Sequence, residues 1–374
     1  MNTAAKTVLI IVLLFIVFIS PVSAQTAVLS TSARYAMAGM EQLKAGDHRA
    51  ARESFERAVR EDDSLYAAHL GLGLASFHLR DDSFAERELL RAAELNPQES
   101  VTYQFLGEIY YRKDDLETAA QYWEKAVERD ASNTSLRARL DRIRKEHHAE
   151  KDFNRDVTSH FLIKYEGREK IEAGRIILRI LEDAYGEIGR ALSYYPDREL
   201  QVILYSGQQF QEVTDAPGWS GAVFDGKIRI PIGGIEQETP GLRKLLYHEY
   251  THAVVRAITP RCPTWLNEGL AQYFESREIG SHQRDILRRI AAEGKLPPLT
   301  ALEGSFMGLG GGQAAYAYLV SLSSVRYMID SFGMYRVKSV LDELGNNANI
   351  GKAISSGILI SYEEFERGWK RSLE

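Results

Sequence analysis

A repeat with a period of 34 residues in the first third of the chain constrains the fold more than any other feature. Glycine recurs at this spacing, at positions 39, 73 and 107. Three further series keep it: Ala51, Ala85 and Ala119; Ala58, Ala92 and Ala126; and the bulky residues Phe55, Leu89 and Trp123. Small residues let the two antiparallel helices of one unit approach closely, and the bulky residue fills the space between them. The repeat therefore predicts an all-helical solenoid.

This pattern resembles the tetratricopeptide repeat, and Pro97 breaks the chain before the third unit. The predicted domain covers 32–133, with units at 32–65, 66–99 and 100–133. A charged stretch at 136–150 predicts a closing helix, within a capping helix and linker at 134–156. The resemblance implies that the concave face holds a substrate or protein partner, although a spacer role fits the same fold.

Charge and cysteine usage exclude several classes of function. The chain has 46 Lys and Arg residues against 52 Asp and Glu residues, a formal net charge of -6. It lacks the basic surface that nucleic acid requires, so we expect no nucleic-acid partner. The single cysteine, Cys262, excludes an internal disulfide and any Cys-rich metal site. A metal ion in this chain must therefore be held by histidines and carboxylates.

The amino terminus predicts export. Lys6 precedes an apolar run at 8–19, which is followed by Pro21 and the small-residue sequence Val22-Ser23-Ala24. We interpret 1–24 as a signal peptide that is cleaved after Ala24. The run is shorter than the ~20 residues of a membrane-spanning helix, so an uncleaved membrane anchor is the minor alternative. The expected location is periplasmic or extracellular.

A second domain begins near residue 157 and continues to 374. Alternating runs at 161–165 and 200–205 predict strands, and an amphipathic stretch at 168–192 predicts a helix between them. A third strand is predicted at 227–232 after the turn Asp225-Gly226. Because Pro231 cannot donate to a ladder, we expect this strand to lie at an edge that is open on one side.

Two helices after this strand carry the candidate chemistry. Thr239 as N-cap and Pro240 in the first turn predict a helix that ends near Ile258. His248 and His252 lie four positions apart and so share one face of it, with Glu249 beside them. Pro263 marks the start of a second helix, which carries Glu268 sixteen positions after His252. If the two helices are antiparallel, Glu268 completes a His2Glu zinc site with one position free for water.

At this point the chain resembles the gluzincin metallopeptidases, in particular the peptidase MA-like domains that often follow tetratricopeptide repeats. The resemblance implies an α+β fold in which a small mixed sheet precedes a helical C-terminal part. It assigns His248, His252 and Glu268 as ligands of one Zn²⁺ ion and Glu249 as general base. The implied reaction is peptide-bond hydrolysis by a zinc-bound water that Glu249 activates.

Substrate contacts are also implied by the resemblance. The sequence Gly-x-Met-Glu-Asn, with which the aminopeptidase branch grips a substrate amine, does not precede the zinc helix. An endopeptidase therefore fits better. In this clan a tyrosine or histidine of the C-terminal helices donates to the oxyanion, and the candidates are Tyr316, which we prefer, and Tyr318. The strand at 228–232 is expected to pair with the substrate, and the glycine-rich stretch at 308–312 to form a mobile loop beside the cleft.

Two other readings of the sequence stay open. In the first, the chain is a partner-binding scaffold whose metallopeptidase-like domain is catalytically silent; the presence of Glu249 argues against it, because a structural zinc site needs no base. In the second, the chain is a zinc hydrolase that acts on an ester or a cell-wall crosslink. The sequence thus predicts an exported zinc metallopeptidase with a peptide or protein substrate.

Overall fold

The computed structural model describes residues 29–167, 170–214, 222–233, 235–306 and 308–373. The predicted signal segment, 1–24, lies outside this part of the chain. Contacts divide the chain into two compact units, which meet at His148 and Ala149. Across the described ranges, every helix is too short or too polar to cross a membrane.

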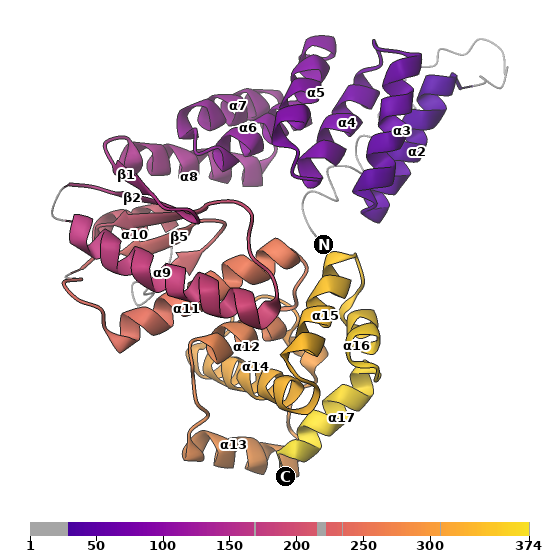
Figure 1. Ribbon diagram of the computed structural model, residues 1–374. Coiled ribbons are helices and arrows are strands. Elements are labelled where there is room, and N and C mark those ends of the chain that lie inside the picture. Colours follow the sequence, from indigo (N-terminus) through magenta and orange to yellow (C-terminus); the bar gives the residue numbers. More distant parts are fainter. Residues whose placement is uncertain (1–28, 168–169, 215–221, 234, 307, 374) are drawn as a thin grey trace. The chain divides into compact units, whose positions relative to one another are not determined.

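The first unit consists of three helix pairs, as the period of 34 predicts (Figure 1). They are α2 (Thr31–Ala45) with α3 (His48–Glu61), α4 (Tyr66–His78) with α5 (Asp82–Leu95), and α6 (Ser100–Arg112) with α7 (Leu116–Arg129). An aspartate caps the second helix of each pair, and each cap accepts from a backbone N–H three residues on: Asp47, Asp81 and Asp115. The charged stretch after the third pair forms α8 (Thr134–Glu150), the expected closing helix.

Inside each pair the repeated glycine lies against the repeated bulky residue: Gly39 against Phe55, Gly73 against Leu89, and Gly107 against Trp123. A Cβ atom at Gly107 would lie 2.3 Å from Trp123 Nε1, far inside van der Waals contact. The indole N–H of Trp123 donates instead to the carbonyl of Gln104, at 3.0 Å. The small and bulky series therefore pack together as the sequence predicts.

The second unit contains a five-stranded mixed sheet in the order β1-β2-β3-β5-β4. The strands are β1 (Asn154–Val157), β2 (Phe161–Tyr165), β3 (Leu200–Tyr205), β4 (Val223–Phe224) and β5 (Ile228–Pro231). The central pairs β2·β3 and β3·β5 are parallel, and both outer pairs are antiparallel. The α+β class and the small mixed sheet predicted from the sequence are confirmed.

Alternation along the strands gives the sheet two different faces. Ile163, Val202 and Ile228 belong to the large apolar core that includes α9 (Ile171–Leu192). Ile203 and Tyr205 face the other way and pack with α10 (Gly207–Thr214) and the segment around Ala149 and Phe153. The first face therefore carries α11 (Pro240–Ile258), which packs into the same core.

The expectation that the strand with Pro231 forms the open edge is wrong. β5 lies between β3 and β4, and β4 is the edge. The N–H of Ile232 donates to Tyr205 on the β3 side, at 2.7 Å. Backbone N–H groups alternate in direction along a strand, so the backbone at position 231 faces the β4 side. The pairing of β4 with β5 has already ended there, because its last pair is Val223 with Arg229. Pro231 thus lies where no strand in the described residues needs its N–H, and the two-residue β4 gave no signal in the sequence.

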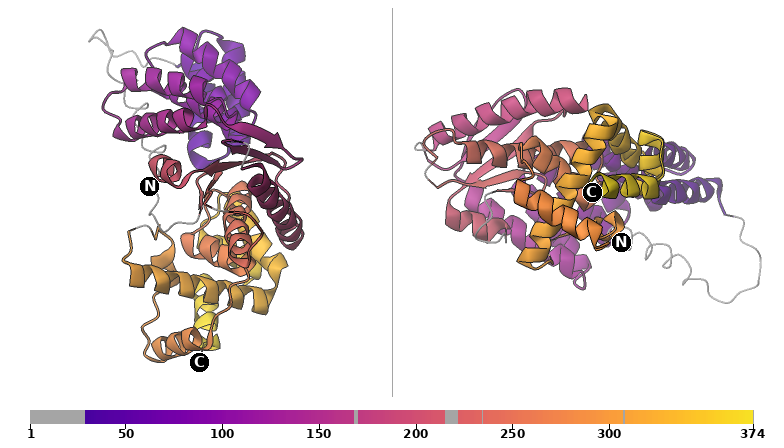
Figure 2. Two further views of the ribbon diagram at one scale, coloured as in Figure 1. Left: turned by 90° about the vertical axis from the view of Figure 1, so that its left-hand side faces the viewer. Right: turned by 90° about the horizontal axis from the view of Figure 1, so that it is seen from below.

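The helix α11 (Pro240–Ile258) and the next helix α12 (Thr264–Phe274) have the predicted starts, and α11 also has the predicted end. The Thr239 side chain accepts from the Leu242 N–H, and Pro240 occupies the first turn. The remaining helices gather into a bundle, orange to yellow in Figures 1 and 2: α13 (Ser281–Ala292), η2 (Leu299–Leu302), α14 (Gly311–Phe332), α15 (Met334–Gly345), α16 (Ile350–Ile358) and α17 (Tyr362–Ser372).

The predicted loop at 308–312 is shorter than expected. Gly311 and Gly312 form the first turn of α14, and Gly310 is its N-cap. The Gln313 side chain accepts from the Gly310 N–H at 3.4 Å, so hydrogen bonding at the helix start overrides the low helix propensity of glycine.

Close approach of α12 and α14 depends on Gly269, the residue after the predicted third ligand. A Cβ atom there would lie 2.4 Å from the carbonyl oxygen of Ser321. That oxygen belongs to the backbone of α14 and cannot rotate away. Any larger residue must therefore push the two helices apart.

We predict that Gly269→Ala lowers the free energy of unfolding by about 1–3 kcal/mol, the usual cost of overpacking. The matched control is Gly186→Ala in α9, where the new Cβ would meet only the mobile end of Arg190, at 3.4 Å. The control should stabilise by up to about 1 kcal/mol, because alanine favours the helix. Urea unfolding of the two full-length variants tests this, and equal midpoints would contradict it.

Candidate metal centre

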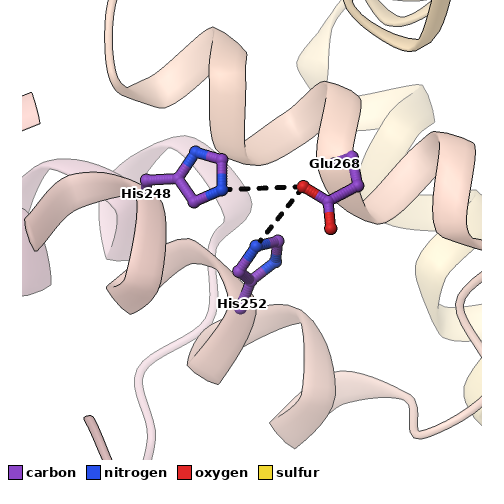
Figure 3. A group of neighbouring side chains, drawn as sticks. All are labelled: His248, His252 and Glu268. Carbon is purple, nitrogen blue, oxygen red and sulfur yellow. Dashed lines mark ion pairs between the residues drawn. The ribbon is translucent and has the colours of Figure 1, made fainter. Parts of the chain in front are cut away.

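The helix α11 presents two imidazoles to one point. His248 and His252 are one turn apart, with ring centroids separated by 4.7 Å and planes at 88°. Glu268 reaches the same point from α12 (Figure 3). The two helices thus bring together the three ligands that the sequence predicts.

The carboxylate oxygen of Glu268 lies close to both imidazole nitrogens, and the three ligand atoms all lie within 4.8 Å of one another. Glu268 Oε2 lies 3.6 Å from the Nε2 atom of His248 and 3.6 Å from that of His252. Four-coordinate zinc, with bonds of about 2.0–2.2 Å, needs ligand atoms about 3.4 Å apart. The Oε2 atom is buried and has no hydrogen-bond partner among the described residues, which suits a metal ligand. His248, His252 and Glu268 form the one such group in the described ranges.

Glu275 is a functional candidate that the sequence reasoning missed. Its Oε2 atom lies 2.9 Å from His248 Nδ1, and its other oxygen forms an ion pair with Arg277 Nε at 2.5 Å. A carboxylate at this position fixes the orientation of the imidazole and makes it a stronger ligand. Glu275 lies seven residues after Glu268, two helical turns along the same face, so helical spacing could have revealed it.

The charges of the site favour the ligand form of Glu268. Burial alone would raise the pKa of this carboxyl, but His248 and His252 lower it overall, so Glu268 is ionised. Burial would lower the pKa of His248, yet the carboxylates of Glu268 and Glu275 raise it to about 10. A metal ion must therefore displace a proton from His248.

Glu249 is buried between α11 and the edge strand β4. Burial raises the pKa of its carboxyl, and the negative charge of Glu268 adds to this, while the two histidines act in the opposite direction. The backbone N–H of Phe224 lies near this carboxyl and lowers its pKa. A strand that is only two residues long thus contacts the residue that the sequence predicts as general base.

The two candidate tyrosines differ in the cause of their raised pKa. Burial and the charges of Glu268 and Glu249 raise the pKa of Tyr318 to about 12. The pKa of Tyr316 is raised by burial, and its hydroxyl has no hydrogen-bond partner among the described residues. The buried Gln272 side chain donates to the Tyr318 carbonyl at 2.9 Å and to that of Glu268 at 3.2 Å. Gln272 thereby holds this part of α14 beside the third ligand.

Comparison with known families agrees with this geometry. Residues 193–374 match the profile of the Peptidase MA superfamily. The chain carries a Peptidase MA superfamily domain. Residues 36–100 and 101–133 match two tetratricopeptide repeat profiles, so the repeats precede this domain. All three metal-ligand candidates lie inside the Peptidase MA match, whereas β1, β2 and α9 lie before it.

Similarity to individual proteins is partial. The chain is 29% identical to anaphase-promoting complex subunit 3 of Schizosaccharomyces pombe over 103 residues, 28% of this chain and 16% of that protein. It is 33% identical to BBSome complex member BBS4 of Bos taurus over 91 residues, 24% of this chain and 17% of that protein. The chain thus spans about a sixth of these relatives. A solved structure, the first TPR of Spaghetti (RPAP3) bound to the HSP90 peptide SRMEEVD, is 20% identical, with a TM-score of 0.30 over 31% of this chain and 93% of that one.

We predict that Glu275→Gln weakens zinc binding about 10- to 100-fold, because the amide orients His248 less firmly than a carboxylate. Glu278→Gln is the matched control, since Glu278 is exposed and pairs with Arg326 instead. Competition with a chromophoric chelator measures both affinities. Equal affinities in the two variants would show that Glu275 does not support the ligand.

Zinc uptake should also release protons. At pH 8 His248 is protonated, because its pKa of about 10 lies above that pH, and it must become neutral to bind the metal. Glu275→Gln removes one cause of the raised pKa, so this variant should release fewer protons at pH 8, by up to about one per zinc. Calorimetry in two buffers of different ionisation enthalpy measures the difference, and identical proton release would refute the assignment.

Proposed function

We propose that the chain is a zinc-dependent endopeptidase. The observation that carries this proposal is the buried carboxylate of Glu249 beside a complete His2Glu ligand set. A metal site that serves only the fold needs no such group, and burying a carboxyl costs free energy, so its presence beside the ligands points to a chemical role.

Each residue of the site has a distinct role in the proposal. His248, His252 and Glu268 hold the zinc ion, which when bound supplies a Lewis acid and a nucleophilic water at neutral pH. Glu249 accepts a proton from the attacking water and returns it to the leaving amine. The Phe224 N–H favours the charged form of Glu249, because it lowers the pKa of this carboxyl.

The edge strand β4 is the proposed docking site for the substrate main chain. It lies at the end of the sheet order and contacts Glu249 through Phe224. An extended peptide can add to such an edge by main-chain hydrogen bonds, whatever its side chains. No amine-binding sequence precedes α11, which favours an endopeptidase over an aminopeptidase.

Replacing the general base gives the direct test. We expect Glu249→Gln to keep one zinc per chain and to hydrolyse casein about 10²- to 10⁴-fold more slowly, because proton transfer is lost while the ligands remain. His248→Ala serves as the comparison variant that loses the metal itself. Zinc in both wild type and Glu249→Gln with hydrolysis in neither would reject the proposal in favour of a scaffold, or of a hydrolase for another bond.

The oxyanion donor is proposed to be Tyr318 rather than Tyr316, because the charges of Glu249 and Glu268 raise the pKa of Tyr318 and not that of Tyr316. Tyr318→Phe should lower kcat about 10²- to 10³-fold, the usual effect of removing one such donor. Tyr316→Phe, two residues away on the same helix, is the matched control. Measuring kcat for both variants decides between them, and a larger loss in Tyr316→Phe would restore the preference drawn from the sequence.

Export and partner docking complete the proposal. Cleavage after Ala24 would place the enzyme in the periplasm or outside the cell, and the intact mass of the mature protein tests this. The repeats are proposed to present a substrate or partner protein to the peptidase domain. An uncleaved segment 1–24 would instead tether the enzyme to a membrane.

A further inference from the structure

A second buried group of charges lies on the face of the sheet that packs with α10. Glu150, Lys164 and Arg229 are 5%, 1% and 0% exposed, so water screens none of them. Lys164 comes from β2 and Arg229 from β5, whereas Glu150 is the last residue of α8. None of the three belongs to the metal centre.

Glu150 joins the two cations. Its Oε2 atom accepts from Lys164 Nζ at 2.6 Å, and its Oε1 atom accepts from the Tyr205 hydroxyl. That hydroxyl in turn accepts from an Arg229 amino group at 2.7 Å, which itself lies 3.6 Å from Glu150 Oε1. Removing one partner of a buried pair leaves an uncompensated charge, which typically costs about 3–5 kcal/mol. The Arg229 side chain is therefore firmly fixed.

Arg229 in turn binds Asp225 in the turn between β4 and β5. Its Nε atom lies 3.2 Å from both carboxylate oxygens of Asp225, the first residue of the turn. Asp225 Oδ1 also accepts from the Lys227 N–H at 3.4 Å, across Gly226, whose φ of +118° requires glycine. The turn is thus held by its own aspartate, and the aspartate is held by Arg229.

The turn sets the direction of the Phe224 N–H. Asp225 N–H donates to the Lys227 carbonyl at 3.3 Å, so these two residues form a hydrogen-bonded pair. In an antiparallel ladder the next pair, Phe224 with Ile228, is not hydrogen-bonded. The Phe224 N–H therefore faces away from β5, toward the Glu249 carboxyl, whose pKa it lowers.

We propose that Asp225 and Arg229, anchored by Glu150, are positioning residues that hold the edge strand β4 against Glu249. The device acts through the strand and touches neither the metal ligands nor the reacting atoms. It keeps Glu249 and the strand β4, the proposed docking site for the substrate, in a fixed relative position, because Phe224 of β4 contacts Glu249. The catalytic consequence rests on the proposed peptidase function, whereas the structural consequence does not.

The first experiment needs no activity. Amide hydrogen exchange is measured in the full chain for wild type, Asp225→Ala and the control Glu182→Ala. Glu182 accepts from His160 at 2.7 Å and Thr158 at 2.8 Å, so the control also removes a carboxylate with two partners. We expect the Phe224 amide to exchange at least tenfold faster in Asp225→Ala alone, with β3 amides unchanged. Unchanged exchange at Phe224, or equal acceleration in the control, overturns the proposal.

The second experiment separates positioning from stability. With one zinc per chain retained, Asp225→Ala should lower kcat at least tenfold with little change in KM, and Asp225→Asn, which keeps one acceptor oxygen, should recover most of it. A lower Tm with unchanged kcat overturns the positioning role. Faster exchange at Phe224 in a protein whose wild type hydrolyses no peptide supports the strand anchor and rejects the peptidase function, so the two failures are distinguishable.

Discussion

The second unit depends on the rule that a carboxylate taken out of water must find compensating partners. Its buried carboxylates meet this rule in different ways. Glu268 lies between two imidazoles, Glu275 is shared by His248 and Arg277, and Glu249 lies near a backbone N–H that lowers its pKa. Each pairing fixes one element relative to another, so charge compensation and the geometry of the site are one requirement.

Close packing of α12 against α14, which involves no charged group, also shapes the metal centre. The third ligand stands beside Gly269, and the absence of a side chain there lets α14 approach α12. Gln272, one turn further along, bonds to carbonyls of both helices. Glu268 is the ligand, Gly269 allows the close approach of α14, and Gln272 bonds to it. These three residues lie within five positions of the sequence. A single short helix therefore determines which side chains of α14 face the metal centre.

The sequence predicted what local periodicity encodes. The period of 34 located the three helix pairs, and the spacing of His248, His252 and Glu268 located the metal centre. Glu275 was missed although its spacing of seven from Glu268 places it on the same face, because the sequence reasoning looked for metal ligands and not for partners of the ligands. The strand β4 escaped because two residues cannot show alternation. Pairing of Glu150 with Lys164 and Arg229 joins segments up to 79 positions apart, which no local pattern records.

The position of Glu150 bears on how such a domain can be inherited. The Peptidase MA match begins at residue 193, and the sequence pattern suggested a boundary at 157. Yet the carboxylate that neutralises Lys164 and Arg229 belongs to the last turn of α8, before both points. A gene fragment that starts at 157 would encode a sheet with two buried cations and no counter-ion from Glu150, and one that starts at 193 would also lack β2 with Lys164. The smallest piece that recombination can move intact therefore includes the end of the helix that closes the repeats.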